Sequence, residues 1–202
     1  MSEQATRLVL EHAREGAQLR ERFFAANAEM LVSIARVMAV NLAKGGKILF
    51  CGNGGSAADA QHLAAEFVNR FLMERPPLPA IALTTDTSVL TAIGNDYSFD
   101  QTFSKQVQAL AKSEDVLVAM STSGNSPNMV EALKSAHDKG TITVGLLGKD
   151  GGDMMALCDF VLHVEDQNTP LIQEVHITAG HMLCRLVDYF LFEAVNELEP
   201  FL

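Results

Sequence analysis

Two short loops rich in glycine and hydroxyl residues each follow an apolar run and precede a helical pattern. The first is CGNGGSA, residues 51–57, and the second is STSGNS, residues 121–126. Glycine lets backbone amides approach a ligand closely, and the free N–H groups at the start of the next helix attract anions. Helix capping explains one serine there, but not four hydroxyl residues and an asparagine in six positions. The second loop therefore predicts a phosphate site made of amides and hydroxyls, without lysine.

A second set of polar residues lies on two predicted helices. His62 and Glu66 are four residues apart, so they share one helix face near the first loop. Gln173 and His181 are eight apart and share roughly one face, whereas His176 points about 60° away from Gln173 on the other side from His181. If the two helices meet, His62, Glu66, Gln173 and His181 converge, and two imidazoles with oxygen ligands suit Zn²⁺. Spacing alone also fits a surface His–Glu pair and a buried structural histidine, which are the commoner arrangements.

The elements that must position these residues alternate along the chain after residue 46. We expect a parallel sheet covered on both faces, because its strands are apolar throughout and alternate with helices. Ligands of such sheets bind at the carboxyl ends of the strands, where both loops fall. The fold class is therefore α/β, a flavodoxin-like three-layer sandwich with a five-stranded sheet. The expected strands are 47–52, 80–85, 115–121, 141–148 and 159–164, and the expected helices are 56–71, 103–111, 126–140 and 172–195.

A long helix is expected ahead of the sheet, over residues 5–43. Its apolar residues recur at spacings of three and four, no proline interrupts it, and glycines at 45 and 46 end it. A bend is possible near residues 24–27. An unbroken helix of this length runs roughly 60 Å, longer than a small domain, so part of it should pack on another subunit. We expect a single domain, residues 1–202, with residues 1–45 as an N-terminal helical extension.

Composition limits the possible partners. The chain has 202 residues and a formal net charge of −10, with no basic run, which argues against nucleic acid as a ligand. The N-terminus is amphipathic and charged, unlike a signal peptide, and no apolar run reaches the length that spans a membrane. The three cysteines are widely spaced and form no CxxC pair, as expected of reduced thiols in the cytoplasm.

One further phosphate motif leaves an alternative open. Gly52, Gly54 and Ala57 match the G-x-G-x-x-A pattern of dinucleotide-binding proteins. That pattern expects an acidic residue about twenty positions on, at the end of the next strand, whereas Asp86 lies about thirty on. In a dinucleotide-binding protein of this kind, the STSGNS loop would also have no role. A nicotinamide-binding protein remains an alternative, and the GxxxxGK[ST] motif of nucleotide triphosphatases is absent.

Five segments carry a family resemblance. CGNGGSAADAQHLAAEF, TAIGNDYSFDQTFSKQV, STSGNSPNMVEAL, GKDGG and IQEVHITAGHMLC, in this order, closely resemble the bacterial phosphoheptose isomerases. These are single sugar-isomerase (SIS) domain proteins that act on sedoheptulose 7-phosphate. The resemblance extends from about Gly46 to Asp188 and is weaker in the N-terminal helix. STSGNS by itself would indicate only the broader SIS superfamily.

The resemblance implies a role for each matching residue. Glu66 and His181 would be the acid–base pair, and His62, Glu66, Gln173 and His181 would hold zinc. The assembly would be a homo-tetramer. Pro170 and Leu171 depart from the family pattern, because many relatives have a polar or basic residue there. The implied substrate-binding residues are Asn53, Gly54, Gly55, Glu66, Asn95, Asp96, Ser121, Thr122, Ser123, Ser126 and Gln173. From the residues alone, Asn95 and Asp96 read as a turn in a loop after the second strand.

The implied reaction interconverts sedoheptulose 7-phosphate and D-glycero-D-manno-heptose 7-phosphate. One proton leaves carbon 1 and returns at carbon 2 through a cis-enediol, and a carboxylate or imidazole can carry it. A metal can stabilise the enediolate oxygens, and the distant phosphate anchors and positions the sugar. The product anomer, the order in which Glu66 and His181 act, and the heptose's use in envelope polysaccharide or another glycoconjugate stay open.

Two non-enzymatic alternatives belong to the same superfamily. Some close relatives bind the replication initiator protein and are not isomerases, and they lack the acidic residue at position 66 and the histidine at position 181. This chain has both Glu66 and His181, which favours the enzyme. Sugar-phosphate sensors of the SIS type usually carry a DNA-binding domain, which this sequence lacks.

Overall fold

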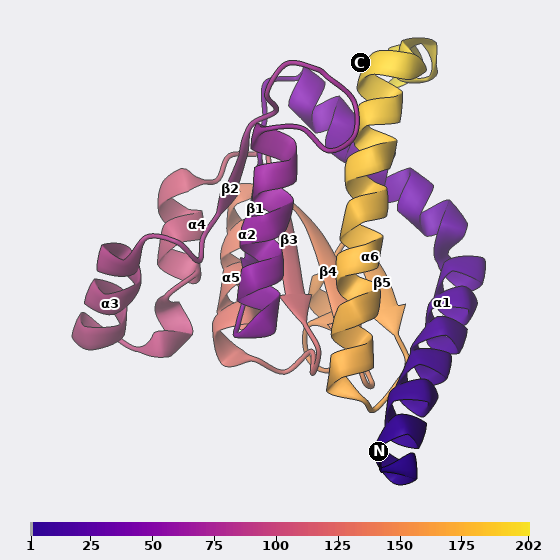
Figure 1. Cartoon of the computed structure of the whole chain (residues 1–202). Coiled ribbons are helices and arrows are strands. Elements are labelled where there is room, and N and C mark those ends of the chain that lie inside the picture. The colour runs from indigo at the N-terminus through magenta and orange to yellow at the C-terminus, as the bar shows by residue number, and fades with distance from the viewer. Residues whose placement is uncertain (1) are drawn as a thin grey trace.

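The computed structural model describes residues 2–202 and contains the expected parallel five-stranded sheet (Figure 1). The strand order is β2-β1-β3-β4-β5, and every neighbouring pair is parallel. β1 and β3 are fully buried, which explains their continuous apolar runs. Because the strands are parallel and in register, the loops after β1, β3 and β4 leave from one edge. The strands are β1 Ile48–Gly52, β2 Ala80–Ala82, β3 Val116–Ser121, β4 Ile142–Gly148 and β5 Phe160–Val164.

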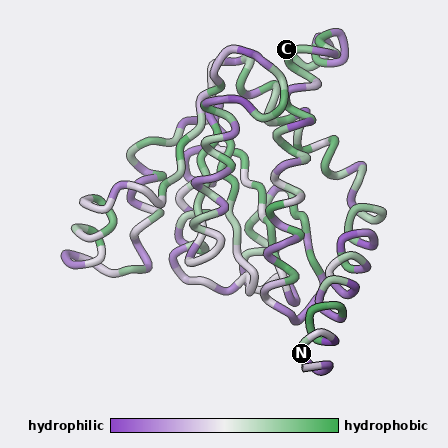
Figure 2. Tube along the Cα trace, in the orientation of Figure 1, coloured by the Kyte–Doolittle hydropathy of each residue, from purple (hydrophilic) through white to green (hydrophobic). Residues whose placement is uncertain are grey.

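Helices cover both faces of this sheet, so the expected three-layer sandwich is confirmed. Alternate residues of β1 point to opposite faces: Ile48 and Phe50 pack with α1, α2 and α6, whereas Leu49 and Cys51 pack with α4 and α5. Strands appear continuously hydrophobic, whereas α2 and α6 alternate along their length (Figure 2). The helices are α1 Glu3–Ala43, α2 Gly55–Val68, α3 Thr87–Asp96, α4 Ser104–Leu110, α5 Pro127–Lys139 and α6 Thr169–Asp188.

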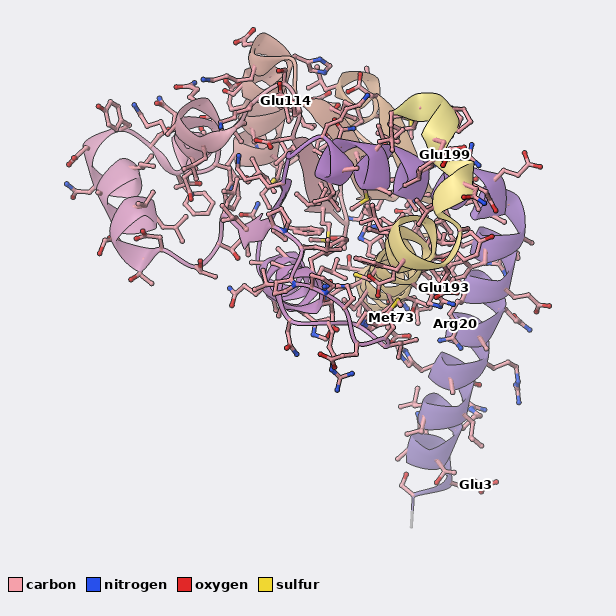
Figure 3. All side chains as sticks on the ribbon, turned by 90° about the horizontal axis from the view of Figure 1, so that it is seen from above. Glu3, Arg20, Met73, Glu114, Glu193 and Glu199 are labelled. Carbon is pink, nitrogen blue, oxygen red and sulfur yellow. The ribbon has the colours of Figure 1, made fainter. Side chains whose placement is uncertain are left out.

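The N-terminal helix α1 has 41 residues and ends where the glycines predicted, with Gly45 at φ +88°. From His12 onwards it contacts α6 and then the sheet layer, and only its first turns extend away from the body towards Glu3 (Figure 3). Leu8, Val9 and Leu10 are therefore exposed. The expectation that part of α1 meets another subunit concerns this exposed apolar end.

The sequence-based statement that no apolar run reaches membrane-spanning length needs correction. α1 contains an 18-residue window with a mean hydropathy of 1.5, which is long and apolar enough to cross a membrane by length and composition alone. The physical reason is that Leu31, Ile34, Met38 and Leu42 belong to the protein core, because this part of α1 packs on the sheet layer. The core helices of soluble proteins meet the same criterion.

Three other expectations differ from the structure. The loop expected around Asn95 and Asp96 is instead the end of helix α3, which Asp86 caps by accepting a hydrogen bond from the amide of Val89 at 2.9 Å. β2 is only three residues long. The last α-helix ends at Asp188, not at residue 195. It continues as a π turn, Tyr189–Glu193, and the remaining short 3₁₀ turns are Phe99–Gln101, Met155–Leu157, Val195–Glu197 and Glu199–Phe201.

Candidate active site between helices α2 and α6

The hydroxyl loop after β3 brings its serines together as the sequence predicts. The Ser121 hydroxyl lies 3.4 Å from the hydroxyls of both Ser123 and Ser126. The backbone amide of Gly124 donates to Ser121 Oγ at 3.1 Å, and that of Asn125 donates to Ser123 Oγ at 3.3 Å. Three hydroxyls therefore converge directly ahead of the N-terminus of α5, where an anion is favoured.

A turn after β4 supports this loop, a role that sequence analysis did not assign. Gly124 has φ +67°, and a side chain there would collide with the carbonyl of Gly151. The amide of Asp153 donates to Asn125 Oδ1 at 3.0 Å. The carbonyl of Thr122 packs against the end of β4. The turn therefore holds the serine loop in a fixed shape, and the glycines of GKDGG allow the close approach.

The glycine loop after β1 is tied to the serine loop by two amide side chains. Asn53 and Asn128 exchange hydrogen bonds, each Nδ2 donating to the other Oδ1 at 2.9 Å. Asn128 is buried in the first turn of α5, and sequence analysis did not single it out. Gly54 has φ +55°, and Gly55 begins α2. Both loops therefore border the same edge of the sheet.

Helices α2 and α6 bring together three of the four predicted metal-ligating residues. The Nε2 atoms of His62 and His181 are 2.8 Å apart, and His62 Nε2 is 3.5 Å from Glu66 Oε1. The ring of Phe71 stacks on that of His181 with centroids 5.5 Å apart. His62 and His181 are 119 positions apart in the sequence, so tertiary packing alone creates this pair.

Two glycines explain why the helices approach so closely. A Cβ atom at Gly180 would lie 2.6 Å from the side chain of Leu63, so only glycine lets α6 pack there against α2. A side chain at Gly55 would likewise collide with the amide group of Gln173. Because Gly180 of α6 packs against Leu63 of α2, their sequence neighbours His181 and His62 also come into contact.

Gln173 does not join the histidines in this structure. Its Nε2 donates to Asp59 Oδ2 at 3.1 Å, one turn of α2 before His62. Asp59 is buried and was missed in the sequence, although its spacing of three from His62 places it on the same helix face. The polar side chains between α2 and α6 therefore form a continuous seam. We call this group the α2–α6 seam, and its members are Asp59, His62, Glu66, Gln173 and His181.

Burial sets the electrostatics of the seam. It lowers the pKa of His181, and His62 adds to this effect while the carboxylates of Glu66 and Asp59 oppose it. Burial raises the pKa of Asp59, against the hydrogen bond from Gln173 and the two imidazoles. A lowered pKa keeps His181 neutral near pH 7, the state in which an imidazole can accept a proton.

The seam has the donor chemistry of a zinc site. Two imidazole nitrogens and a carboxylate oxygen are typical zinc ligands, and Gln173 lies two turns before His181 on the same helix. Across residues 2–202, however, no group of three or more His, Cys, Asp or Glu side chains already lies at metal-binding spacing. The 2.8 Å between the two Nε2 atoms is shorter than the roughly 3.3 Å expected of two nitrogens on one tetrahedral zinc. The donor set fits zinc once the two rings separate slightly.

Asn95 and Asp96 lie apart from the seam and the serine loop. They end α3, which stands beside the β2 edge of the body, on the side away from α6 (Figure 1). The Asn95 amide donates to Asp96 at 2.9 Å, and both side chains are exposed. Asp86, the acidic residue weighed for a dinucleotide site, is engaged in capping α3.

His176 is buried against the sheet, away from the seam. We therefore expect the free energy of unfolding to depend on pH. Burial lowers the pKa of His176 to about 4, partly offset by the backbone of Leu147 and reinforced by His163. The unfolded chain therefore binds this proton first, so stability should fall as pH drops from about 6.5 towards 4. We expect a loss of about 2 kcal/mol between pH 6.5 and 5, measured by urea unfolding. His176→Leu should lose much of this dependence, and an unchanged pH slope would contradict the assignment.

Comparisons with known proteins agree on one family. The SIS domain family model matches residues 11–148. A phosphoheptose isomerase of Nitratidesulfovibrio vulgaris strain Miyazaki F is 66% identical over 202 residues, covering all of this chain and 97% of that protein. The structure of a phosphoheptose isomerase from Neisseria gonorrhoeae has a TM-score of 0.86 and 46% identity over 91% of this chain and 98% of that one. One from Francisella tularensis has a TM-score of 0.88 and 38% identity over the same shares.

Proposed function

This chain belongs to the phosphoheptose isomerases of the SIS domain family, and from this membership we propose how its own residues interconvert sedoheptulose 7-phosphate and D-glycero-D-manno-heptose 7-phosphate. The enzyme class is an aldose–ketose isomerase of a sugar phosphate. The observation that carries the proposed mechanism is the convergence of Glu66, His62 and His181 between α2 and α6.

The serine loop binds the phosphate in this proposal. Ser121, Ser123 and Ser126 present three hydroxyls, and the amides at the start of α5 add donors. Asn53, Gly54, Gly55 and Thr122 belong to the two loops at this edge of the sheet and would add contacts to the sugar phosphate. The seam begins beside the glycine loop, where the Gln173 amide lies against Gly55, and it continues along α2, with His62 seven residues, or about 10 Å, from the start of that helix. An extended heptose 7-phosphate places its reacting carbons at the end opposite the phosphate, which suits this separation.

Glu66 and His181 transfer the proton in this proposal. Removal of a proton from carbon 1 of the ketose and its return at carbon 2 require a group that accepts and then donates it. The Glu66 carboxylate and the neutral His181 imidazole are both suited to accept it near pH 7. His62 contacts both residues and orients them. Asn95 and Asp96 remain proposed substrate contacts. Because α3 lies apart from the seam of its own chain, these contacts would have to come from outside that seam.

Zinc is part of the proposal as a cofactor. His62, Glu66, His181 and Gln173 would hold it, with Gln173 released from Asp59. When bound, the ion would polarise the sugar carbonyl and stabilise negative charge on the enediolate oxygens. Phe71, which stacks on His181, limits the ring's rotation and so keeps Nε2 directed at this position.

The decisive test of this function is turnover of sedoheptulose 7-phosphate by the purified protein. We expect formation of the aldose phosphate, a loss of activity after treatment with a chelator, and recovery with added Zn²⁺. Absence of turnover on this and other ketose phosphates, with zinc present, would exclude the isomerase mechanism. Turnover that is unaffected by complete removal of metal would exclude the zinc cofactor but not the isomerase activity.

We also propose that residues 1–202 form one SIS domain that assembles into a homo-tetramer. A groove of about 640 Å³ lies between α1 and α6, and a second copy of the chain would fill it. It is mostly apolar, as expected of a surface covered in the assembly. Its lining is Ala17, Arg20, Glu21, Phe24, Ala28, Leu31, Val32, Thr178, Met182 and Leu186.

The groove predicts the effect of a charge on assembly. Val32→Asp should lower the mass found by light scattering below that of a tetramer, because a carboxylate would be buried unpaired at the interface. Leu110→Asp is the matched control, since Leu110 is an exposed apolar residue on α4, on the other face of the sheet. A wild-type monomer at micromolar concentration, or an unchanged mass for Val32→Asp, would contradict this assembly.

The proposed location is the cytoplasm, where sugar phosphates are found. Cys51, Cys158 and Cys184 are all free thiols, in keeping with a reducing compartment. Burial raises the pKa of all three thiols, so they are poor nucleophiles at neutral pH. The isomerase mechanism therefore needs no cysteine.

A further inference from the structure

The guanidinium group of Arg75 is buried against the last turn of α2. Its Nη2 donates to the backbone carbonyl of Glu66 at 2.9 Å, and its Nη1 donates to the carbonyl of Phe67 at 2.8 Å. Its Nε donates to Asp188 Oδ1 on α6 at 2.7 Å. The side chains of Arg75 and Asp188 are 1% and 2% exposed. One planar cation therefore joins the end of α2 to the end of α6.

The position of these contacts on α2 follows from helix geometry. The last carbonyls of a helix have no partner within the helix and need donors from elsewhere. After α2 ends, the chain loops back over the ends of α2 and α6, which brings Arg75 to those carbonyls (Figure 1). Glu66 is one of the residues so capped, so its backbone is held directly by the arginine.

The position of Asp188 on α6 links the same cation to His181. The two residues are seven apart, so they lie on one face of α6, two turns from each other. Asp188 Oδ2 has no hydrogen-bond partner within residues 2–202, so Arg75 is the main partner of this buried carboxylate. Movement of α6 relative to α2 would separate Arg75 from Asp188 and leave the buried carboxylate of Asp188 without its main partner.

We propose that Arg75 and Asp188 are positioning residues that hold Glu66 in place against His181 for proton transfer. This inference rests on the proposed roles of Glu66 and His181. The core contacts between α2 and α6 are apolar and tolerate small sliding, whereas the hydrogen bonds of a guanidinium have fixed directions. A displacement of about 1 Å can cost about 10²-fold in rate, so a capped Glu66 backbone matters for catalysis beyond stability.

The test is the double variant Arg75→Met/Asp188→Leu. Replacing both partners of a buried ion pair by apolar residues is often neutral or stabilising, so this variant should stay folded and lose only the stability that the donors of Arg75 give to the carbonyls of Glu66 and Phe67. We expect its kcat to fall by about 10²-fold. Its KM should change little, because the serine loop lies at the other end of α2. Arg75→Lys is the second variant, as it keeps the charge but cannot reach Asp188 and both carbonyls together.

Two controls separate the possible outcomes. Asp115→Asn weakens another ion pair, with Lys47, directly ahead of β1 and β3 and outside the α2–α6 contact, and it should lower stability without lowering the kcat of folded protein. Glu66→Gln is measured in parallel. If Glu66→Gln is inactive while a folded Arg75→Met/Asp188→Leu or Arg75→Lys variant keeps wild-type kcat, the positioning role is overturned. If Glu66→Gln itself keeps wild-type kcat, the proposed function fails instead.

Discussion

Glu66→Gln is expected to lower kcat by about 10²–10⁴-fold, the usual contribution of general acid–base catalysis. The substitution keeps the size of the side chain and removes its charge and its basicity. His181→Ala should cost at least as much, because His181 and Glu66 act on the same proton in the proposed mechanism. Steady-state kinetics with sedoheptulose 7-phosphate measure both effects. Zinc content, measured after purification, should also fall in both variants, since a metal site loses much of its affinity with one ligand.

Both variants should remain folded, because Glu66 and His181 are only partly buried. Glu74→Gln is a matched control: Glu74 is an exposed carboxylate that follows α2 and pairs with Arg70 on the surface. It should leave kcat and zinc content unchanged. A folded Glu66→Gln protein that turns over substrate at nearly the wild-type rate would refute the acid–base assignment.

Ser121→Ala and Ser123→Ala are expected to reduce kcat/KM by about 10- to 150-fold each, mainly through a higher KM. A hydrogen bond to a charged group contributes about 1.5–3 kcal/mol, and each 1.4 kcal/mol is a factor of ten. Ser121→Ala should show the larger effect, because Ser121 is buried and its Oγ accepts a hydrogen bond from the Gly124 amide at 3.1 Å, whereas the bond from Asn125 to Ser123 Oγ is longer, at 3.3 Å, and exposed. Loss of the Ser121 hydroxyl therefore removes a ligand contact and loosens the loop.

Ser135→Ala provides the comparison for these two variants. Ser135 is a buried serine on α5, the helix that follows the serine loop, and its hydroxyl accepts a hydrogen bond from Gln108. This variant should bind substrate normally. Wild-type KM and kcat/KM in both loop variants would place the phosphate elsewhere.

Local sequence patterns were sufficient for the sheet and for the serine loop. The central strands β1 and β3 are buried on both faces, so their residues form continuous apolar runs that separate clearly from the helices. The serine loop is contiguous in sequence, so its hydroxyls must lie close together once the strand–loop–helix unit forms. The α3 helix was missed because its sequence, TSVLTAIGND, contains β-branched residues and ends in turn-forming ones, which mask a helix that Asp86 caps.

Sequence patterns predicted the contacts within the seam less well than they predicted the sheet. Spacing placed His62 with Glu66 and placed Gln173 roughly with His181, since each pair lies on one helix. Spacing could not show that Gln173 contacts Asp59 and not the histidines, or that Asn128 pairs with Asn53. These contacts depend on how far one helix is translated and rotated against another, which sequence periodicity does not describe.

The sequence by itself determined the α/β class, the two loops rich in glycine and hydroxyl residues at the carboxyl ends of β1 and β3, and the residue types proposed for isomerisation. Those features depend on the spacing of apolar residues, on the glycine content and on the residues that begin each helix, and all three are local properties of the sequence. Only the tertiary structure decided that the imidazoles of His62 and His181 meet and that Arg75 joins Glu66 to Asp188. The physical reason is that close contact of Gly180 with Leu63 sets the separation of α2 and α6, and a buried cation then holds the two helices in register.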